Sequence, residues 1–383
     1  MLHTRSKSLE RHLNTLLVVC LLIPAFALTA LADGEGGGIV ATTIEEAQAD
    51  EDYVLLGEYV GPVELTAERT YQRVGLQVRA IGDGNYEALQ SLGGLPGEAE
   101  YDANVASLFG KRLGEYLILS GGPYAVIVHS DHCVVIDEEG DRIGRLERVM
   151  RESPTMGAPA PAEATILFDG TNVEQFSVGQ MTEDGLLMQG AEFKPMFQDF
   201  NMHAEFRLPH KPLGREQDRC NSGFYLQRRY ELQVLDSFAT TPVFNGCGAL
   251  YRYQTPDLNM CLPPLQWQTY DVIFTAPRWA SDGTKTRNAR ITVWQNGVKI
   301  QDDLELKNKT GAGQPEGSDL LPILIQDHGN PICFRNIWVV DRGLTPIVDF
   351  PVYPETEEEA PAPVEPQTIE PEDESNASQD QEE

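Results

Sequence analysis

Short segments in which apolar and polar residues alternate follow one another from about residue 165 to about residue 343, and this pattern constrains the fold most strongly. "NMHAEFRL" alternates regularly, while "SGFYLQRRYELQVLDS" is longer and rich in residues that favour strands. "ARITVWQNGVKIQDDLEL" contains Asn296 and Gly297 between two such runs, and both residues tolerate the positive φ of a hairpin turn. No long helical periodicity competes with these runs. The pattern predicts an all-β domain, an antiparallel sandwich or jelly roll.

The remainder of the chain divides into segments of different composition. Residues 53–150 contain runs such as "VGLQVRAIGDGNYEAL", which predict strands joined by polar turns and hence a small β domain. The Pro/Ala/Gly-rich residues 151–163 predict a linker to the main domain at 164–344. Residues 33–52 are Gly-rich and predict a flexible leader. The acidic, Pro-rich residues 345–383 predict a disordered tail, because such a segment cannot bury enough apolar surface to become ordered.

The N-terminus has the features of a secretory signal. Basic residues precede the apolar run "TLLVVCLLIPAFALTALA", which ends in a small-x-small cleavage pattern at Ala30 and Ala32. The run is short for a membrane span, so a signal peptide at 1–32 is favoured over an uncleaved anchor. No other stretch is apolar enough to form a stable membrane span. The sequence therefore predicts export to the periplasm or the extracellular space.

Export would permit disulfide bonds. Cleavage of the signal would leave an odd number of cysteines, of which Cys247 and Cys261 form the best pair by spacing. Connectivity does not follow from the sequence.

The charge balance excludes one class of partner. The chain carries 29 Lys and Arg residues against 59 Asp and Glu residues, a formal net charge of -30. A chain this acidic is repelled by phosphate backbones and by anionic lipid, so we expect no nucleic-acid partner.

Polar side chains interrupt the apolar pattern of the segment "RRYELQVLDS". Glu231 and Gln233 share one face of the predicted strand, because side chains alternate across a strand. A single bulge would return Asp236 to the same face. Two carboxylates on one strand face suit glycoside chemistry, and Arg228 and Arg229 could hold them ionised. The alternative is a solvated strand face with ordinary charges.

The stretch "QDHGNP" is a second candidate for chemistry. It follows the apolar run "LPILI", so Gln326 and His328 fall on one face and Asp327 on the other. Gly329 and Asn330 indicate a turn, a bulge or the close approach of a sugar to the backbone. His328 is a candidate acid or base because the ordinary pKa of histidine is near neutral. A lone histidine in a strand is more often structural.

"HSDHC" is a third candidate, because His129, Asp131, His132 and Cys133 are metal-ligand types. Its spacing matches no strong zinc signature, so a turn between strands is the favoured interpretation. Four aromatic residues near the polar clusters could stack on sugars, although most aromatics in a sandwich lie in the core: Tyr225, Tyr251, Tyr253 and Trp267.

Several motifs, taken in order, carry a family resemblance. "TILFDGTNVEQF", "CNSGFYLQRRYELQVLDSF", "CGALYRYQTPDLNMCLPPLQWQTYDVIF" and "LIQDHGNPICFRNIWV" resemble the 3-keto-disaccharide hydrolase domain family. The resemblance implies a concanavalin-like jelly roll and action on sugars already oxidised at C3. Cleavage would proceed by abstraction of the C2 proton, elimination and hydration. The resemblance implies no required cofactor, although a divalent metal could stabilise the enolate, and it implies a separate sugar 3-oxidase upstream.

Roles are assigned by position within this resemblance. Glu231 is the expected base, and His328 the expected acid or enolate partner, while Asp236 would tune either one or bind a sugar hydroxyl. The expected substrate-binding residues are Arg228 at the keto oxygen, Gln233, Gln326 and Asn330 at the hydroxyls, and in addition Tyr251 and Asp327. Two alternatives remain open: a conventional retaining glycosidase of the laminarinase-like jelly-roll type, and a non-catalytic carbohydrate-binding module.

Overall fold

The structure is a computed structural model, and it describes residues 38–343 except for residues 66–69 and 123. The predicted signal peptide, the first part of the leader and the acidic tail lie outside the described residues. Within the described part of the chain, no helix combines the length and the apolar character that crossing a membrane requires. The described part of the leader contains a short helix, α2 (Ile44–Ala47), which begins with a capping box between Thr43 and Glu46. This part of the leader is therefore not the flexible coil that its composition predicts.

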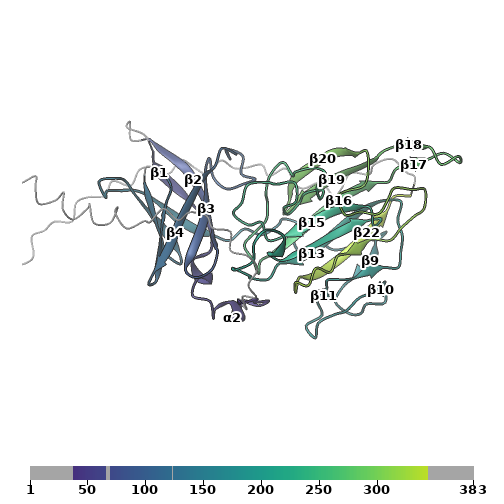
Figure 1. The fold of residues 1–383 in the computed structure, drawn as a ribbon, viewed down its shortest axis with the longest axis horizontal. Coiled ribbons are helices and arrows are strands. Elements are labelled where there is room, and N and C mark those ends of the chain that lie inside the picture. Colours follow the sequence, from purple (N-terminus) through teal and green to yellow (C-terminus); the bar gives the residue numbers. More distant parts are fainter. Residues whose placement is uncertain (1–37, 66–69, 123, 344–383) are drawn as a thin grey trace, which may run out of the picture. The chain divides into compact units, whose positions relative to one another are not determined.

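The small β domain is a closed barrel of eight antiparallel strands in sequential order, with β8 pairing back to β1 (Figure 1). Its interior is filled by apolar side chains such as Tyr59, Leu76 and Tyr86. The predicted strands of this segment are confirmed. The strands are β1 (Gly57–Glu64), β2 (Tyr71–Ala80), β3 (Asn85–Leu92), β4 (Ala106–Leu113), β5 (Tyr116–Ser120), β6 (Ala125–Val128), β7 (His132–Ile136) and β8 (Arg142–Val149).

Residues 129–131 of the "HSDHC" stretch form the turn from β6 to β7, and His132 and Cys133 begin β7. The backbone N–H of His129 donates to the carbonyl of His132 at 2.8 Å, and Cys133 points into the barrel core. The interpretation as a turn is confirmed.

The main domain is a jelly-roll sandwich of two antiparallel sheets, as predicted. The first sheet has the strand order β10 (Phe176–Val178), β12 (Glu192–Phe193), β21 (Leu324–Ile325), β14 (Asn221–Leu226) and β15 (Tyr230–Leu235). The second has the order β11 (Leu187–Met188), β22 (Cys333–Asp341), β13 (Asp199–Arg207), β16 (Trp267–Thr275), β19 (Ala289–Gln295) and β20 (Val298–Leu306), with β9 (Thr165–Phe168) paired to β22. A separate two-stranded ribbon consists of β17 (Arg278–Trp279) and β18 (Lys285–Arg287).

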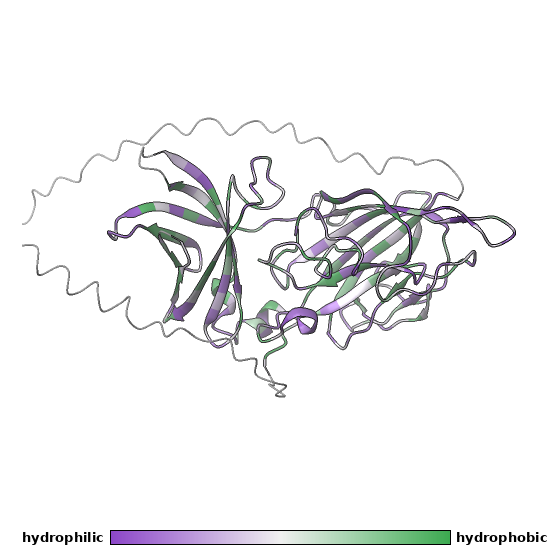
Figure 2. Cartoon of the chain, turned by 45° about the horizontal axis from the view of Figure 1, so that its top comes forward, coloured by the Kyte–Doolittle hydropathy of each residue, from purple (hydrophilic) through white to green (hydrophobic). Residues whose placement is uncertain are grey.

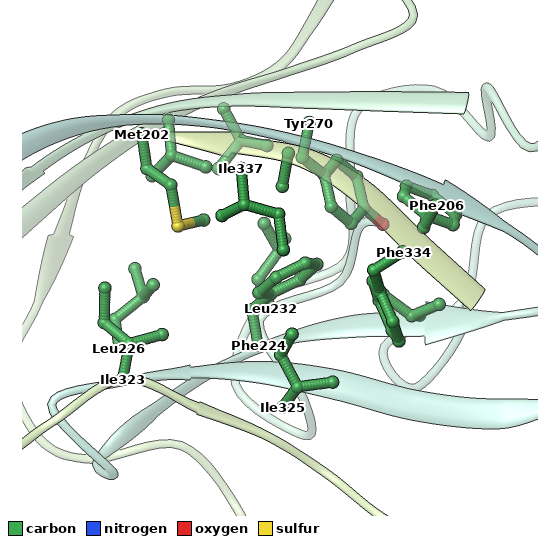
Figure 3. Close-up of a cluster of buried hydrophobic side chains, with 14 of the residues drawn as sticks. Met202, Phe206, Phe224, Leu226, Leu232, Tyr270, Ile323, Ile325, Phe334 and Ile337 are labelled. Carbon is green, nitrogen blue, oxygen red and sulfur yellow. The ribbon is translucent and has the colours of Figure 1, made fainter. Parts of the chain in front are cut away.

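The core of the sandwich lies between these two sheets. Alternate residues of each strand point inward, and Figure 2 shows the resulting alternation of hydrophobic and hydrophilic residues along the strands. Figure 3 shows the seven-stranded sheet contributing Met202, Phe206, Tyr270, Phe334 and Ile337. These face Phe224, Leu226, Leu232 and Ile325 of the five-stranded sheet, together with Ile323, which directly precedes β21. The residues between these, on the opposite faces of the strands, are therefore turned away from the core.

Turn chemistry fixes the register of two hairpins. Asn296 and Gly297 join β19 to β20 with φ values of 50° and 82°, as the sequence predicts. Gln227 and Arg228, with φ values of 49° and 53°, turn β14 back into β15. The second turn brings two polar strand faces side by side, and the candidate site lies there.

The first half of the linker forms hydrogen bonds to the sandwich. The Thr155 hydroxyl donates to Asp271 Oδ2 at 2.6 Å, and the Gly157 N–H donates to Glu205 Oε1 at 2.7 Å. Both carboxylates flank His203, whose Nδ1 lies 2.6 Å from Asp271 Oδ1 and whose Nε2 lies 3.5 Å from Glu205 Oε1. All three side chains are buried on the outer face of the seven-stranded sheet. Residues 151–158 therefore cover a polar cluster.

The five cysteines within the described residues are free, buried thiols. The predicted bond between Cys247 and Cys261 is not formed. Both lie in the sandwich core, where the Cys247 sulfur is 3.2 Å from the Tyr270 hydroxyl and accepts a hydrogen bond from Gln295 Nε2 at 3.3 Å.

Candidate active site

The outer face of the five-stranded sheet carries a row of polar side chains where β14 and β15 pair. The register places Tyr225 opposite Glu231 and Gly223 opposite Gln233. Phe224 and its neighbours in β15 point into the core, so these four residues point to the other face. The alternation predicted for Glu231 and Gln233 is confirmed.

Glu231 is a buried carboxyl group with a hydrogen-bond partner on the neighbouring strand. Its side chain is 1% exposed, and the Tyr225 hydroxyl donates to its carboxylate. Burial raises the pKa of Glu231 to about 7, against the opposing effect of this hydrogen bond. Gly223 makes room for the group, because a Cβ at that position would lie 2.8 Å from Glu231 Oε1. A carboxyl group with this pKa can exchange a proton near neutral pH.

Amide side chains surround the carboxyl group on the same face. Gln233 Nε2 and Asn221 Nδ2 both donate to Gln217 Oε1, at 3.0 and 3.2 Å. Gln217 in turn donates from Nε2 to the carbonyl of Asn245 at 2.9 Å. Gln217 belongs to the 3-10 helix η2 (Glu216–Asp218), which thereby covers this end of the face.

On the other side of β14, Gln326 continues the sheet beyond β21. Its backbone N–H donates to the carbonyl of Gly223 at 2.9 Å, and its carbonyl accepts from the Ser222 hydroxyl at 2.8 Å. Its side-chain Nε2 donates to the Tyr225 hydroxyl at 3.4 Å. Gln326 and Glu231 therefore both contact Tyr225, one on each side.

Four buried oxygens on this face accept no hydrogen bond from the described residues. They are Glu231 Oε2, Gln233 Oε1, Gln326 Oε1 and Asn221 Oδ1. Buried polar atoms normally have partners, so a group of acceptors without donors on the protein is filled by water or by a ligand that supplies donors. A molecule with several hydroxyl groups has this property.

The structure does not place Asp236 with Glu231. β14 and β15 pair without a register shift from Asn221↔Leu235 to Leu226↔Tyr230, so the predicted bulge is absent. Asp236 follows the last paired residue, and its Oδ2 accepts a hydrogen bond from Arg219 Nε at 2.8 Å. Both side chains of this ion pair are buried. The prediction was wrong because the strand ends at Leu235 and a buried arginine holds the carboxylate.

The two arginines of the hairpin do not hold Glu231 ionised. The Arg228 guanidinium pairs with Glu192 Oε2 at 3.0 Å. Arg229 donates to the carbonyls of Pro315 and Asp319. Glu231 therefore has a raised rather than a lowered pKa, and this expectation was wrong.

The residues that follow Gln326 have other surroundings. His328 and Asp327 are exposed, and His328 makes no hydrogen bond or ion pair within the part of the chain that the structure describes. Asp327 accepts the N–H of Gly329, and the Asn330 side chain accepts the N–H of Asn221 at 2.7 Å. Asn330 therefore supports the strand that carries the site. The catalytic role of His328 stays a prediction.

Tyr251 lies at the edge of β15. Its backbone N–H donates to the carbonyl of Glu231 at 3.0 Å, and the Arg252 guanidinium lies 5.4 Å from the centre of its ring. Its ring is half-buried beside the site, and the aromatic candidate Trp267 lies on the other sheet, in β16.

Sequence reasoning missed the roles of Gly223, Asn221 and Gln217, and it treated Tyr225 only as a stacking candidate. The available signal was the turn between β14 and β15. Once its length is fixed, the register sets Tyr225 opposite Glu231 and the glycine opposite Gln233. Gln217 had no such signal, because a loop outside the hairpin carries it. Among residues 38–343, masked positions aside, no cluster of three or more His, Cys, Asp or Glu side chains could hold a metal ion.

Comparison with known proteins supports a carbohydrate-active hydrolase or lyase. Residues 163–340 match the 3-keto-alpha-glucoside-1,2-lyase-like domain. The chain is also similar to a solved structure from Parabacteroides distasonis ATCC 8503 that is provisionally assigned as a glycosyl hydrolase. That similarity has 34% identity over 48% of this chain and 85% of the other, with a TM-score of 0.45. Residues 163–340 therefore form a 3-keto-alpha-glucoside-1,2-lyase-like domain.

A second structure from the same organism, with the same provisional assignment, is 18% identical over 47% of this chain and 94% of its own length, with a TM-score of 0.35. No curated protein matches the chain.

Proposed function

We propose that the sandwich domain cleaves the glycosidic bond of 3-keto-glycosides, with Glu231 as the base that removes the proton from C2. Family membership supports the substrate class. The observation that carries the proposal is the buried Glu231 carboxyl, with a pKa of about 7, among oxygens that lack hydrogen-bond donors.

The chemistry follows from the ketone at C3. The ketone makes the hydrogen on C2 acidic, because the electron pair left on C2 can delocalise onto the keto oxygen. Loss of this proton gives an enolate, and expulsion of the glycosidic oxygen from C1 leaves a C1–C2 double bond. Addition of water to that bond gives the free 3-keto sugar. A base with a pKa near neutral suits the first step, because it is partly ionised yet still basic.

The surrounding amides suit the recognition of hydroxyl groups. The oxygens of Gln233, Gln326 and Asn221 lie on one face and have no donor within the described chain. Sugar hydroxyls can supply these donors. The steps need no cofactor, and the ketone would have to be introduced by a separate oxidoreductase that oxidises C3.

A conventional glycosidase needs a second carboxyl group about 5 to 9.5 Å from the first. Asp236 is held by Arg219 and does not serve. In the row of paired residues that crosses the sheet, Glu192 is the next carboxylate, and it lies three strands away from Glu231. Three interstrand spacings amount to about 14 Å. The elimination route needs a single base, so the site suits it better.

Product release from paired substrates tests the proposal. The purified protein would be given a 3-keto disaccharide and the same disaccharide unoxidised. We expect release from the keto sugar alone, and we expect Glu231→Gln to lower the rate by about 100-fold or more. Release from the unoxidised sugar would point to a conventional glycosidase. Sugar binding without release would point to a binding module.

A further inference from the structure

Tyr225 is placed to act together with Glu231 on the same substrate. It sits directly opposite Glu231 in the β14–β15 pair, on the same face. Side chains in such positions have Cβ atoms about 5 Å apart, so one sugar ring can reach both. The Tyr225 hydroxyl donates to Glu231 and accepts from Gln326 Nε2 at 3.4 Å. It therefore has a defined position between a proton acceptor and a hydrogen-bond donor.

We propose that Tyr225 is the general acid of the site, which protonates the glycosidic oxygen as it leaves C1. This inference rests on the proposed function and adds a second catalytic group to it.

The protons gained and lost in this step are exchanged between Glu231 and Tyr225. Glu231 takes the C2 proton, and the C2–H electrons become the C1–C2 double bond as the C1–O bond breaks. The leaving oxygen keeps the electrons of the C1–O bond and takes the proton of the Tyr225 hydroxyl. Tyr225 then recovers a proton from Glu231 through their hydrogen bond. The pair returns to a carboxylate and a phenol without any co-reactant.

The surroundings of Tyr225 suit this sequence of events. Burial, with the nearby charge of Glu231, raises the pKa of Tyr225, so the phenol stays protonated before reaction. Once Glu231 has taken the C2 proton its charge is gone, and the phenol becomes a better acid. The Gln326 amide N–H stabilises the negative charge that develops on the Tyr225 oxygen.

Leaving-group dependence in matched variants tests the inference. Tyr225→Phe and His328→Ala would be compared with the native protein on a 3-keto disaccharide, methyl 3-keto-glucoside and 4-nitrophenyl 3-keto-glucoside. An acid is needed for the first two leaving groups, whereas nitrophenolate departs without one. We expect Tyr225→Phe to lower kcat/KM by about 100-fold or more for the disaccharide and the methyl glucoside. We expect a loss below about tenfold for the nitrophenyl glucoside, whereas any loss in His328→Ala should be equal on all three substrates.

A second readout separates the acid from the base. In D2O, exchange of the C2 proton reports Glu231 alone, so it should persist in Tyr225→Phe and disappear in Glu231→Gln. If circular dichroism shows that Tyr225→Phe does not fold, Gln326→Leu replaces it. This variant should shift the leaving-group dependence in the same direction.

Several outcomes would overturn the inference. Native activity of Tyr225→Phe on the disaccharide would do so, as would an equal loss on all three substrates with C2 exchange also lost. Leaving-group dependence in His328→Ala would assign the acid to His328 instead. If the native protein cleaves none of the keto substrates, the proposed function itself fails, and the inference falls with it.

Discussion

At the scale of single residues, the candidate site depends on a carboxyl group kept out of water. An ionised carboxylate loses hydration when buried, so Glu231 holds its proton up to a pKa of about 7 instead of the ordinary 4.5. A buried carboxyl group of this kind costs stability in its charged form. The raised pKa of Glu231 therefore carries a folding penalty that can be measured.

Replacing Glu231 by glutamine should remove a pH dependence of stability. The folded pKa lies above the unfolded value, so the stabilising effect of protonation is full below pH 4.5 and is lost as the pH rises through 7. From pH 4 to pH 8 the free energy of unfolding of Glu231→Gln should therefore gain about 3 kcal/mol relative to the native protein. Urea unfolding followed by tryptophan fluorescence measures this, because Trp267, Trp279, Trp294 and Trp338 all lie in the sandwich.

Glu183→Gln is the matched control, because Glu183 is exposed. Its free energy of unfolding should stay within about 0.5 kcal/mol of native at both pH values. An equal stability difference between Glu231→Gln and the native protein at pH 4 and pH 8 would contradict the raised pKa.

Which site residues could be predicted depends on how local their partners are. Glu231 and Gln233 were predictable, because alternation along one strand places both on one face. The position of Asp236 was not predictable, because Arg219 lies 17 residues away in sequence and no local pattern predicts their ion pair. The contact of Tyr225 with Glu231 requires the register of the hairpin, which a sequence pattern sets only to within a residue or two.

At the scale of elements, the β14–β15 hairpin is the part of the sandwich that builds the site. One side of the hairpin supplies Phe224 and Leu232 to the core, and the other supplies Tyr225 and Glu231. A one-residue slip would exchange the two faces, so the apolar core fixes the register of the polar site. Gly223 has a particular role here, since its missing side chain leaves space for the Glu231 carboxyl.

Adding one methyl group at Gly223 should reduce activity more than stability. In Gly223→Ala the new Cβ would lie 2.8 Å from Glu231 Oε1 and 3.0 Å from its Cγ, so the carboxyl must move. A displacement of about 1 Å can cost about 100-fold in rate, whereas moving a side-chain end costs about 1–3 kcal/mol of stability. Steady-state kinetics on a 3-keto disaccharide and thermal melts would measure the two effects.

Gly122→Ala is the control, because a Cβ there would have no neighbour within 4 Å. It should leave rate and melting temperature unchanged. Native kinetics in Gly223→Ala would show that the observed position of Glu231 is not the one used in turnover.

Strands and hairpins were predictable because their signals are local. Asn296 and Gly297 predict the β19–β20 turn, and the alternation in "NMHAEFRL" predicts β13. The assignment of strands to sheets was not available from these signals. β14 lies between β21 and β15, and β21 follows β14 by about a hundred residues, a pairing that no local pattern indicates.

At the scale of the whole molecule, the segment between the barrel and the sandwich shows how composition can mislead. Its Pro/Ala/Gly content predicts a spacer. However, Thr155 and Gly157 donate hydrogen bonds to the buried carboxylates of Asp271 and Glu205. Burial alone would lower the pKa of the nearby His203, but its hydrogen bond to Asp271 and the adjacent carboxylate of Glu205 raise it above its ordinary value. The first half of the linker therefore belongs structurally to the sandwich, and the domain begins before the first residue matched by the family, residue 163.

Two truncations should therefore differ in stability although both keep all the strands of the sandwich. Residues 151–343 retain the bonds from Thr155 and Gly157, whereas residues 164–343 lose both. Hydrogen bonds to charged groups contribute about 1.5–3 kcal/mol each, so the free energy of unfolding of the shorter piece should be about 3–6 kcal/mol lower, or the piece should fail to fold. Tryptophan fluorescence during urea unfolding measures the difference.

Single substitutions in the full chain separate this effect from the loss of chain length. Thr155→Val removes the bond to the buried Asp271 Oδ2 and should cost about 1–3 kcal/mol. Thr171→Val removes a similar bond, from Thr171 to Asp169, in an exposed turn and should cost less than about 0.5 kcal/mol. Equal stability of the two truncations, together with a neutral Thr155→Val, would mean that water replaces the linker without loss. The boundary of the sandwich domain would then lie near residue 163, as composition alone predicts.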